Sequence, residues 1–123
     1  MFNDMVKQYP TPSVPPAPPA GSLDALFAAL AHPTRRAIAE RLARGSATAG
    51  EVAAPFDVSA PAISRHLRTL EAGGLIVRRR RGREHVLSLN AGRLDEAERW
   101  IARTRAFWDA RLDALARHLE ERP

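Results

Sequence analysis

The chain has 123 residues, of which 45% are hydrophobic, and this is enough apolar material for one domain with a compact core. Its 19 Lys and Arg residues outnumber 14 Asp and Glu residues, and the net charge of +5 favours a polyanionic partner such as nucleic acid or an anionic membrane surface. The sequence contains no cysteine, which excludes disulfides, thiolate metal sites and cysteine nucleophiles.

Arginine supplies nearly all of the positive charge, since Lys7 is the only lysine. A guanidinium group binds a phosphate or a guanine edge with two hydrogen bonds, which favours nucleic acid as the partner, although a GC-rich genome would give the same usage. No apolar run approaches the roughly 18 residues of a membrane span, and the N-terminus lacks the apolar core of a secretory signal. We therefore expect a cytoplasmic, nucleoid-associated protein without a membrane partner.

Residues 1–21 form the first segment, and they hold most of the ten prolines in "YPTPSVPPAPPAG". This composition cannot build a core and favours extended conformations, so we predict a disordered tail. A Pro-rich ligand for another protein is the alternative.

Two helices are predicted after this tail. Helical periodicity begins at Leu23, with Ser22 as the N-cap, in "SLDALFAAL". A second helix begins at Pro33, which suits the first helical position, and it ends at Gly45.

A short third helix and a longer fourth helix follow. The third begins with Thr48 and Glu51 in "TAGE", which have the spacing of a capping box. After the break "PFDVS", Ser59 is expected to cap the fourth helix, which ends at the glycine pair 73–74. Its core-facing residues recur at i, i+4 and i+7 and are Ile63, Leu67 and Leu70.

A β-hairpin is predicted next, in "LIVRRRRGREHVLSL". Residues 75–80 and 83–89 alternate in polarity well enough for two strands joined through Arg81 and Gly82. Five arginines therefore lie in the six positions 78–83, at the end of the hairpin.

A long amphipathic helix is expected from Asn90 or Asp95 to about Glu121, with apolar residues recurring every seven positions. Such a helix is about 40 Å long, which exceeds the width of the rest of the domain, so we expect a second copy of the chain to cover part of its apolar face. The predicted dimer interface consists of Leu23, Phe27, Leu94, Trp100, Ile101, Phe107, Trp108, Leu112, Leu115 and Leu119.

This order of elements describes a winged helix-turn-helix over residues 22–121: a mainly α fold with a β-hairpin wing and dimerisation helices at both ends. The fourth helix is then the recognition helix, and Arg65 is the best candidate for a guanine contact. Its predicted DNA-binding residues are Ser59, Ala60, Pro61, Ala62, Ser64, Arg65 and Arg68. Those of the wing are Arg78, Arg79, Arg80, Arg81 and Arg83.

With these motifs, "AHPTRRAIAERLARG" and "GEVAAPFDVSAPAISRHLRTLEAGGLIVRRRRGREHVLSLN", the chain resembles the ArsR family of bacterial transcriptional regulators. The resemblance implies a homodimer on a palindromic operator, usually a repressor that is released by an inducer, here an unknown small molecule or protein. It assigns the recognition helix to residues 59–70, the wing to 75–89 and the dimer surface to the first and last helices.

The sequence departs from the family pattern at its metal sites. Many members bind metals through Cys-x-Cys on the third helix, and "TAGEVAAPF" has no ligand there. A second family site uses Asp and His followed by His and Glu; His118 and Glu121 are weak candidates for the second pair, but Arg105 and Phe107 stand in place of the first. We therefore expect no metal and no cofactor. His32 replaces the usual Asp cap, which predicts a weaker helix start.

Two remaining histidines are expected in structural positions, His66 half-buried and hydrogen-bonded and His85 on the outside of the wing. No nucleophile, base and orienting group occur together, which argues against an enzyme. The competing hypothesis is a basic protein that binds RNA or the nucleoid without reading sequence, although exposed aromatic residues for stacking on single strands are few.

Overall fold

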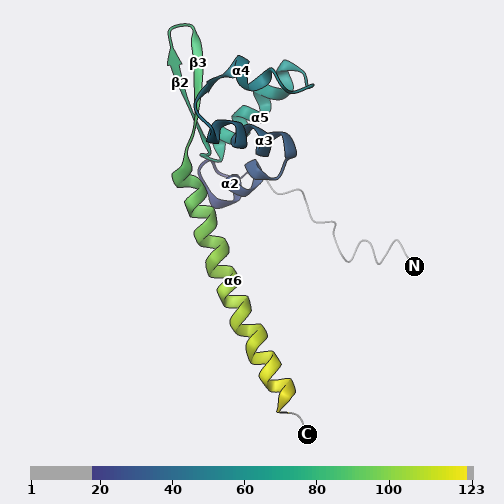
Figure 1. Cartoon of the computed structure of the whole chain (residues 1–123). Helices are drawn as coiled ribbons and strands as arrows, with labels where there is room; N and C mark the ends of the chain where they lie inside the picture. The colour runs from purple at the N-terminus through teal and green to yellow at the C-terminus, as the bar shows by residue number, and fades with distance from the viewer. Residues whose placement is uncertain (1–17, 122–123) are drawn as a thin grey trace, which may run out of the picture.

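The computed structural model describes residues 18–121. Residues 1–17 of the predicted tail therefore lie outside the described residues. The architecture is mainly helical with a small antiparallel sheet, as predicted for a winged helix-turn-helix (Figure 1). In chain order the elements are α2 (Leu23–Leu30), α3 (Pro33–Ala43), β1 (Ala47–Thr48), α4 (Ala49–Ala53), α5 (Ala60–Ala72), β2 (Ile76–Arg81), β3 (Glu84–Leu89) and α6 (Ala91–Glu120).

Side-chain caps fix where the short helices begin. The hydroxyl of Ser22 accepts from the first turn of α2, Thr48 and Glu51 form the capping box of α4, and Ser59 caps α5, as predicted. His32 also caps its helix, because its Nδ1 accepts from the Thr34 N–H at 3.1 Å. An imidazole therefore takes the place of a carboxylate at the start of α3.

The sheet has the strand order β1-β3-β2. In the hairpin Ile76 pairs with Leu89 and Arg81 with Glu84, so the turn is Gly82–Arg83, and the predicted turn at Arg81 and Gly82 is wrong by one residue. Gly82 has φ +66°, and a two-residue hairpin turn favours glycine at its first central position, which places Arg81 in the strand.

β1 is an element that the sequence did not predict. It has two residues, and Ala47 pairs with Leu87 on β3 across 40 positions of the chain. Two residues are too short to show an alternating pattern. The strand ties the start of α4 to the hairpin.

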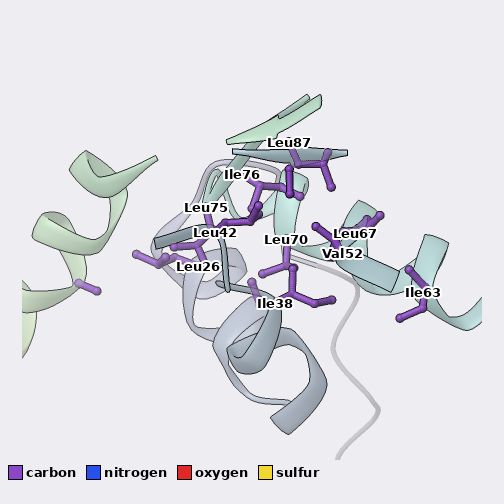
Figure 2. Close-up of a cluster of buried hydrophobic side chains, with 13 residues drawn as sticks. Leu26, Ile38, Leu42, Val52, Ile63, Leu67, Leu70, Leu75, Ile76 and Leu87 are labelled. Atoms are coloured by element: carbon purple, nitrogen blue, oxygen red, sulfur yellow. The ribbon is translucent and has the colours of Figure 1, made fainter. Parts of the chain in front are cut away.

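The core lies between the helices and the inner face of the sheet (Figure 2). Leu26, Ile38, Leu70 and Leu87 are completely buried, and they come from α2, α3, α5 and β3. The predicted apolar stripe of α5 faces this cluster. Burial of each such side chain stabilises the fold by roughly 1.5–3 kcal/mol, so the core holds α5 against α2, α3 and the sheet.

Arg93 connects α6 to the rest of the domain. Its guanidinium donates to the carbonyl of Gly73 at 2.9 Å and to the carbonyls of Gly21 and Ser22 at 2.6 and 2.7 Å, and it pairs with Glu96. Gly73 also lets α5 approach α2, because a Cβ there would lie 2.9 Å from the carbonyl oxygen of Ala25. The ends of α2, α5 and α6 therefore meet at one point.

Candidate nucleic-acid interface

α5 presents a polar face opposite its buried stripe. Of the predicted reading residues only Ala62 is half-buried, and the exposed ones are Ser59, Ala60, Pro61, Ser64, Arg65 and Arg68. The Ser59 hydroxyl accepts the capping bond from the Ala62 N–H at 3.3 Å, which leaves its own proton free to be donated. The face combines two guanidinium groups and two hydroxyls with small apolar side chains, which suits close approach to base edges.

The register of the hairpin determines which wing residues share a face. Side chains that pair across an antiparallel ladder point to the same side, so Arg78 and Arg80 lie on the face of the buried Leu87. Arg79 and Arg81 lie on the opposite face. The arginine run is therefore divided between the two sides of the wing.

Arg78 ties the wing to α5. Its Nε and Nη2 donate to one carboxylate oxygen of Glu71 at 2.9 and 2.6 Å, and both side chains are about one-third exposed. This partly screened pair uses two of the donors of Arg78 within the protein. Arg78 consequently holds the position of the wing relative to α5.

The other four wing arginines point into solvent near the turn, and the Nε of Arg80 donates to the carbonyl of Gly82 at 3.2 Å. No ion pair between residues of the described part of the chain involves Arg79, Arg80, Arg81 or Arg83. The hairpin projects from the domain on the side away from the free end of α6 (Figure 1). Uncompensated positive charge thus gathers at one end of the molecule.

The other flank of α5 carries a cluster that the sequence revealed only in part. His66 is half-buried and hydrogen-bonded, as predicted: its Nδ1 lies 3.3 Å from Nη1 of Arg35 on α3. The ring of His32 packs on it with 4.4 Å between ring centroids. Burial lowers the pKa of His66, and the charges of His32, Arg35 and Arg65 lower it further. Arg35 was missed because nothing local links it to a residue 31 positions away.

α6 leaves most of its apolar stripe uncovered. Its only buried residue is Ala97, and the half-buried Phe27 of α2 contacts Trp100 edge to face with centroids 5.3 Å apart. Beyond this contact the exposed fractions are 56% for Trp108 and 57% for Leu112. The predicted interface residues divide into Leu23, Phe27 and Leu94, which are half-buried, and seven exposed ones, Trp100, Ile101, Phe107, Trp108, Leu112, Leu115 and Leu119.

Residues 18–121 contain no group of three or more His, Asp or Glu side chains arranged to hold a metal ion. His118 is exposed in the last turn of α6 and Glu121 is exposed at its C-cap, and Asp109 pairs with Arg105 at 3.9 Å. His85 is exposed on the wing, as predicted. None of the described helices is long and apolar enough to cross a membrane.

Known proteins share this arrangement. A helix-turn-helix domain family matches residues 30–79. The chain is 38% identical over 76 residues to the transcriptional repressor SdpR of Bacillus subtilis (strain 168), covering 62% of this chain and 84% of the relative. It is 37% identical over 99 residues to the HTH-type transcriptional regulator Rv2034 of Mycobacterium tuberculosis (strain ATCC 25618 / H37Rv). This match covers 80% of this chain and 90% of the relative.

A solved structure extends this likeness to the fold. The ArsR-like transcriptional regulator from Rhodococcus sp. RHA1 superposes with a TM-score of 0.72 at 35% identity, covering 81% of this chain and 94% of that one. The protein therefore belongs to the ArsR family of winged helix-turn-helix proteins, and it is a DNA-binding transcriptional regulator and not an enzyme.

Proposed function

We propose that this protein is a homodimeric repressor that binds a palindromic operator, with α5 in the major groove and the β2–β3 wing on the DNA backbone. The observation that carries the proposal is the exposed Ser and Arg face of α5 beside a wing in which four exposed arginines form no ion pair with any residue of the described range 18–121. SdpR, the relative described above, is named a transcriptional repressor. Residues 22–121 would act together as the DNA-binding and dimerisation unit.

Base reading is assigned to the exposed residues of α5. The exposed guanidinium of Arg65 can make a bidentate contact to guanine, and Ser64 can donate to a base or a phosphate. The side chains of Ala60 and Pro61 at the start of the helix are small enough to approach thymine methyl groups. Sequence preference would therefore depend on α5.

Affinity is assigned to the wing. Its exposed arginines can each neutralise a backbone phosphate, which strengthens binding to every sequence equally. If each protomer neutralises two or three phosphates, a dimer loses affinity about 10²- to 10³-fold between 50 and 200 mM salt. The wing would thus set how salt-dependent the complex is.

Dimerisation is assigned to α6 together with α2. α6 has 30 residues, which corresponds to about 45 Å, and its exposed apolar side chains continue the stripe that begins at the half-buried Leu94. A second copy would remove this stripe from water and would bring two recognition helices to successive major grooves, about 10 base pairs apart. An inducer, a small molecule or another protein, would release the dimer from DNA.

Selection of binding sites from random DNA tests the proposal. We expect a two-fold symmetric site, bound about 10³-fold or more tightly than random DNA in a gel-shift assay. A ratio below about ten would instead favour the alternative, a basic protein that binds nucleic acid without reading sequence. Sedimentation at micromolar concentration should show a dimer, and a monomer would contradict the assigned interface.

A further inference from the structure

Arg35 lies where three helices meet. It is in the first turn of α3, and its guanidinium donates to two carbonyls in the last turn of α2, from Nη2 to Ala28 at 2.7 Å and from Nε to Ala29 at 2.9 Å. Its third nitrogen faces Nδ1 of His66 on α5. Because a planar guanidinium holds its donors in a fixed fork, these contacts fix α5 relative to both other helices.

The contact with His66 requires a neutral imidazole. A guanidinium can only donate, so Nδ1 of His66 accepts and the ring proton is on Nε2. His32, which packs on this ring, uses its own Nδ1 to accept from the Thr34 N–H. The two packed rings are therefore both used as acceptors.

Two guanidinium groups and a second imidazole lie around His66. His32 and Arg35 approach from the start of α3, and Arg65 precedes it on α5, while α2 contributes the carbonyls that hold Arg35. A proton on Nδ1 would remove the acceptor that faces Nη1 of Arg35 and would place a second cation against it. The folded protein therefore favours the neutral form, consistent with the lowered pKa of His66.

This cluster adjoins the reading face of α5. Arg35, Arg65 and His66 line one hollow of about 270 Å³ together with Ala62 and Thr69. A rotation of α5 about its axis would move Arg65. The ion pair between Glu71 on α5 and Arg78 on the wing would then either move the wing with the helix or be strained. The position of the guanine-reading side chain thus depends on the contact between Arg35 and His66.

We propose that Arg35 is a positioning residue for DNA readout, which fixes the rotation of the recognition helix by donating to neutral His66. The inference rests on the proposed function, because the rotation of α5 matters only if α5 reads bases. Protonation of His66 adds positive charge beside the DNA, which favours binding to any sequence. The expected consequence of acid is therefore a loss of sequence preference and not a loss of binding.

The direction of the pH effect follows from the neutral state of the ring. The contact contributes its full stabilisation above the ordinary histidine pKa of about 6.5 and loses it as the pH falls through the lowered pKa of folded His66. We expect the ratio of affinities for a selected site and for random DNA to fall about tenfold between pH 8 and pH 5, which corresponds to the loss of one base contact.

Two substitutions separate positioning from a merely structural role. His66→Asn keeps an acceptor in the place of Nδ1 but cannot titrate, so it should hold the same ratio at both pH values. Arg35→Lys keeps the charge but loses the planar set of guanidinium donors. The ratio of its affinities for the selected site and for random DNA should therefore already be about tenfold lower at pH 8, and it should not fall further at pH 5. His118→Asn, on the exposed last turn of α6, is the matched control and should follow the unmodified protein. Circular dichroism at each pH verifies the fold of every variant.

The outcomes are distinct. An unchanged ratio between pH 8 and pH 5 in the unmodified protein would overturn the positioning role, as would a parallel fall in His66→Asn. If Arg35→Lys does not fold, the pH profiles of the unmodified protein and of His66→Asn still test the positioning role. A protein that selects no sequence at pH 8 would contradict the proposed function itself, and the positioning role with it.

Discussion

α5 and α6 are both amphipathic helices, and they differ in what covers the apolar side. The stripe of α5, which includes Leu67 and Leu70, is buried by α2, α3 and the sheet, so the side proposed to function is the polar one. The stripe of α6 beyond Trp100 has no cover within the described chain, so the side proposed to function is the apolar one. The same sequence periodicity therefore accompanies the proposed reading surface in one helix and the proposed assembly surface in the other.

The largest expected effect is on stability, and it appears when leucine is replaced by alanine in α5 but not when the same replacement is made in α6. Leu70→Ala should lower the free energy of unfolding by about 2–5 kcal/mol, because it opens a cavity in a completely buried position. Leu112→Ala should lower the stability of an isolated protomer by less than about 0.5 kcal/mol, since this side chain is 57% exposed.

Denaturant unfolding at two protein concentrations measures both changes. The destabilisation caused by Leu70→Ala should be the same at both concentrations. The destabilisation caused by Leu112→Ala should appear only where the protein is dimeric. Equal changes for the two variants in dilute solution would contradict the contrast between the helices.

A charge in the middle of the α6 stripe should dissociate the dimer. Trp108→Asp would place a carboxylate in the proposed interface and weaken association by about 2 kcal/mol or more, roughly 30-fold, as measured by sedimentation. The helical content should remain, because Trp108 is 56% exposed and contributes little to the core. Ala110→Asp, about half a turn away on the same helix, is the control and should leave the dimer intact.

On the polar side of α5, Arg65→Ala should relax the preference at one base pair of each half-site. The expected cost is about 1–3 kcal/mol for the selected site and much less for random DNA. Competition assays with sites altered at single base pairs measure this directly. A uniform decrease in affinity for all sequences would instead assign Arg65 to the phosphate backbone.

Most of the fold was predictable because its signals are local. Ser22, Thr48 and Ser59 cap helices within three residues of their own positions, and the apolar stripe of α5 lies within two turns. The wing turn was misplaced by one residue because both candidate turns contain Gly82, and only its positive φ at the first central position decides between them. Local patterns thus identify elements better than they identify register.

The contacts that orient the site were not predictable. Arg93 reaches carbonyls at residues 21 and 22, and Arg35 reaches a histidine 31 positions along the chain. A long polar side chain at a helix surface has the same periodic signature whether it is solvated or bonded to a distant carbonyl. Arg78 is a third case, since its position in a basic run predicts a phosphate contact while the fold engages it with Glu71.

Substitution of the wing arginines should give the smallest change in DNA affinity per residue. It tests whether the wing supplies affinity while α5 supplies sequence preference. Arg79→Ala with Arg81→Ala removes two exposed cations from the outer face of the wing, and it should flatten the dependence of log affinity on log salt by about 1 for each phosphate that is no longer neutralised. The selected sequence should not change. Arg103→Ala, an exposed arginine on α6, should leave the slope as it was. An unaltered slope in the wing variant would show that these two arginines do not bind phosphate, because a complex that neutralises fewer phosphates must release fewer counterions.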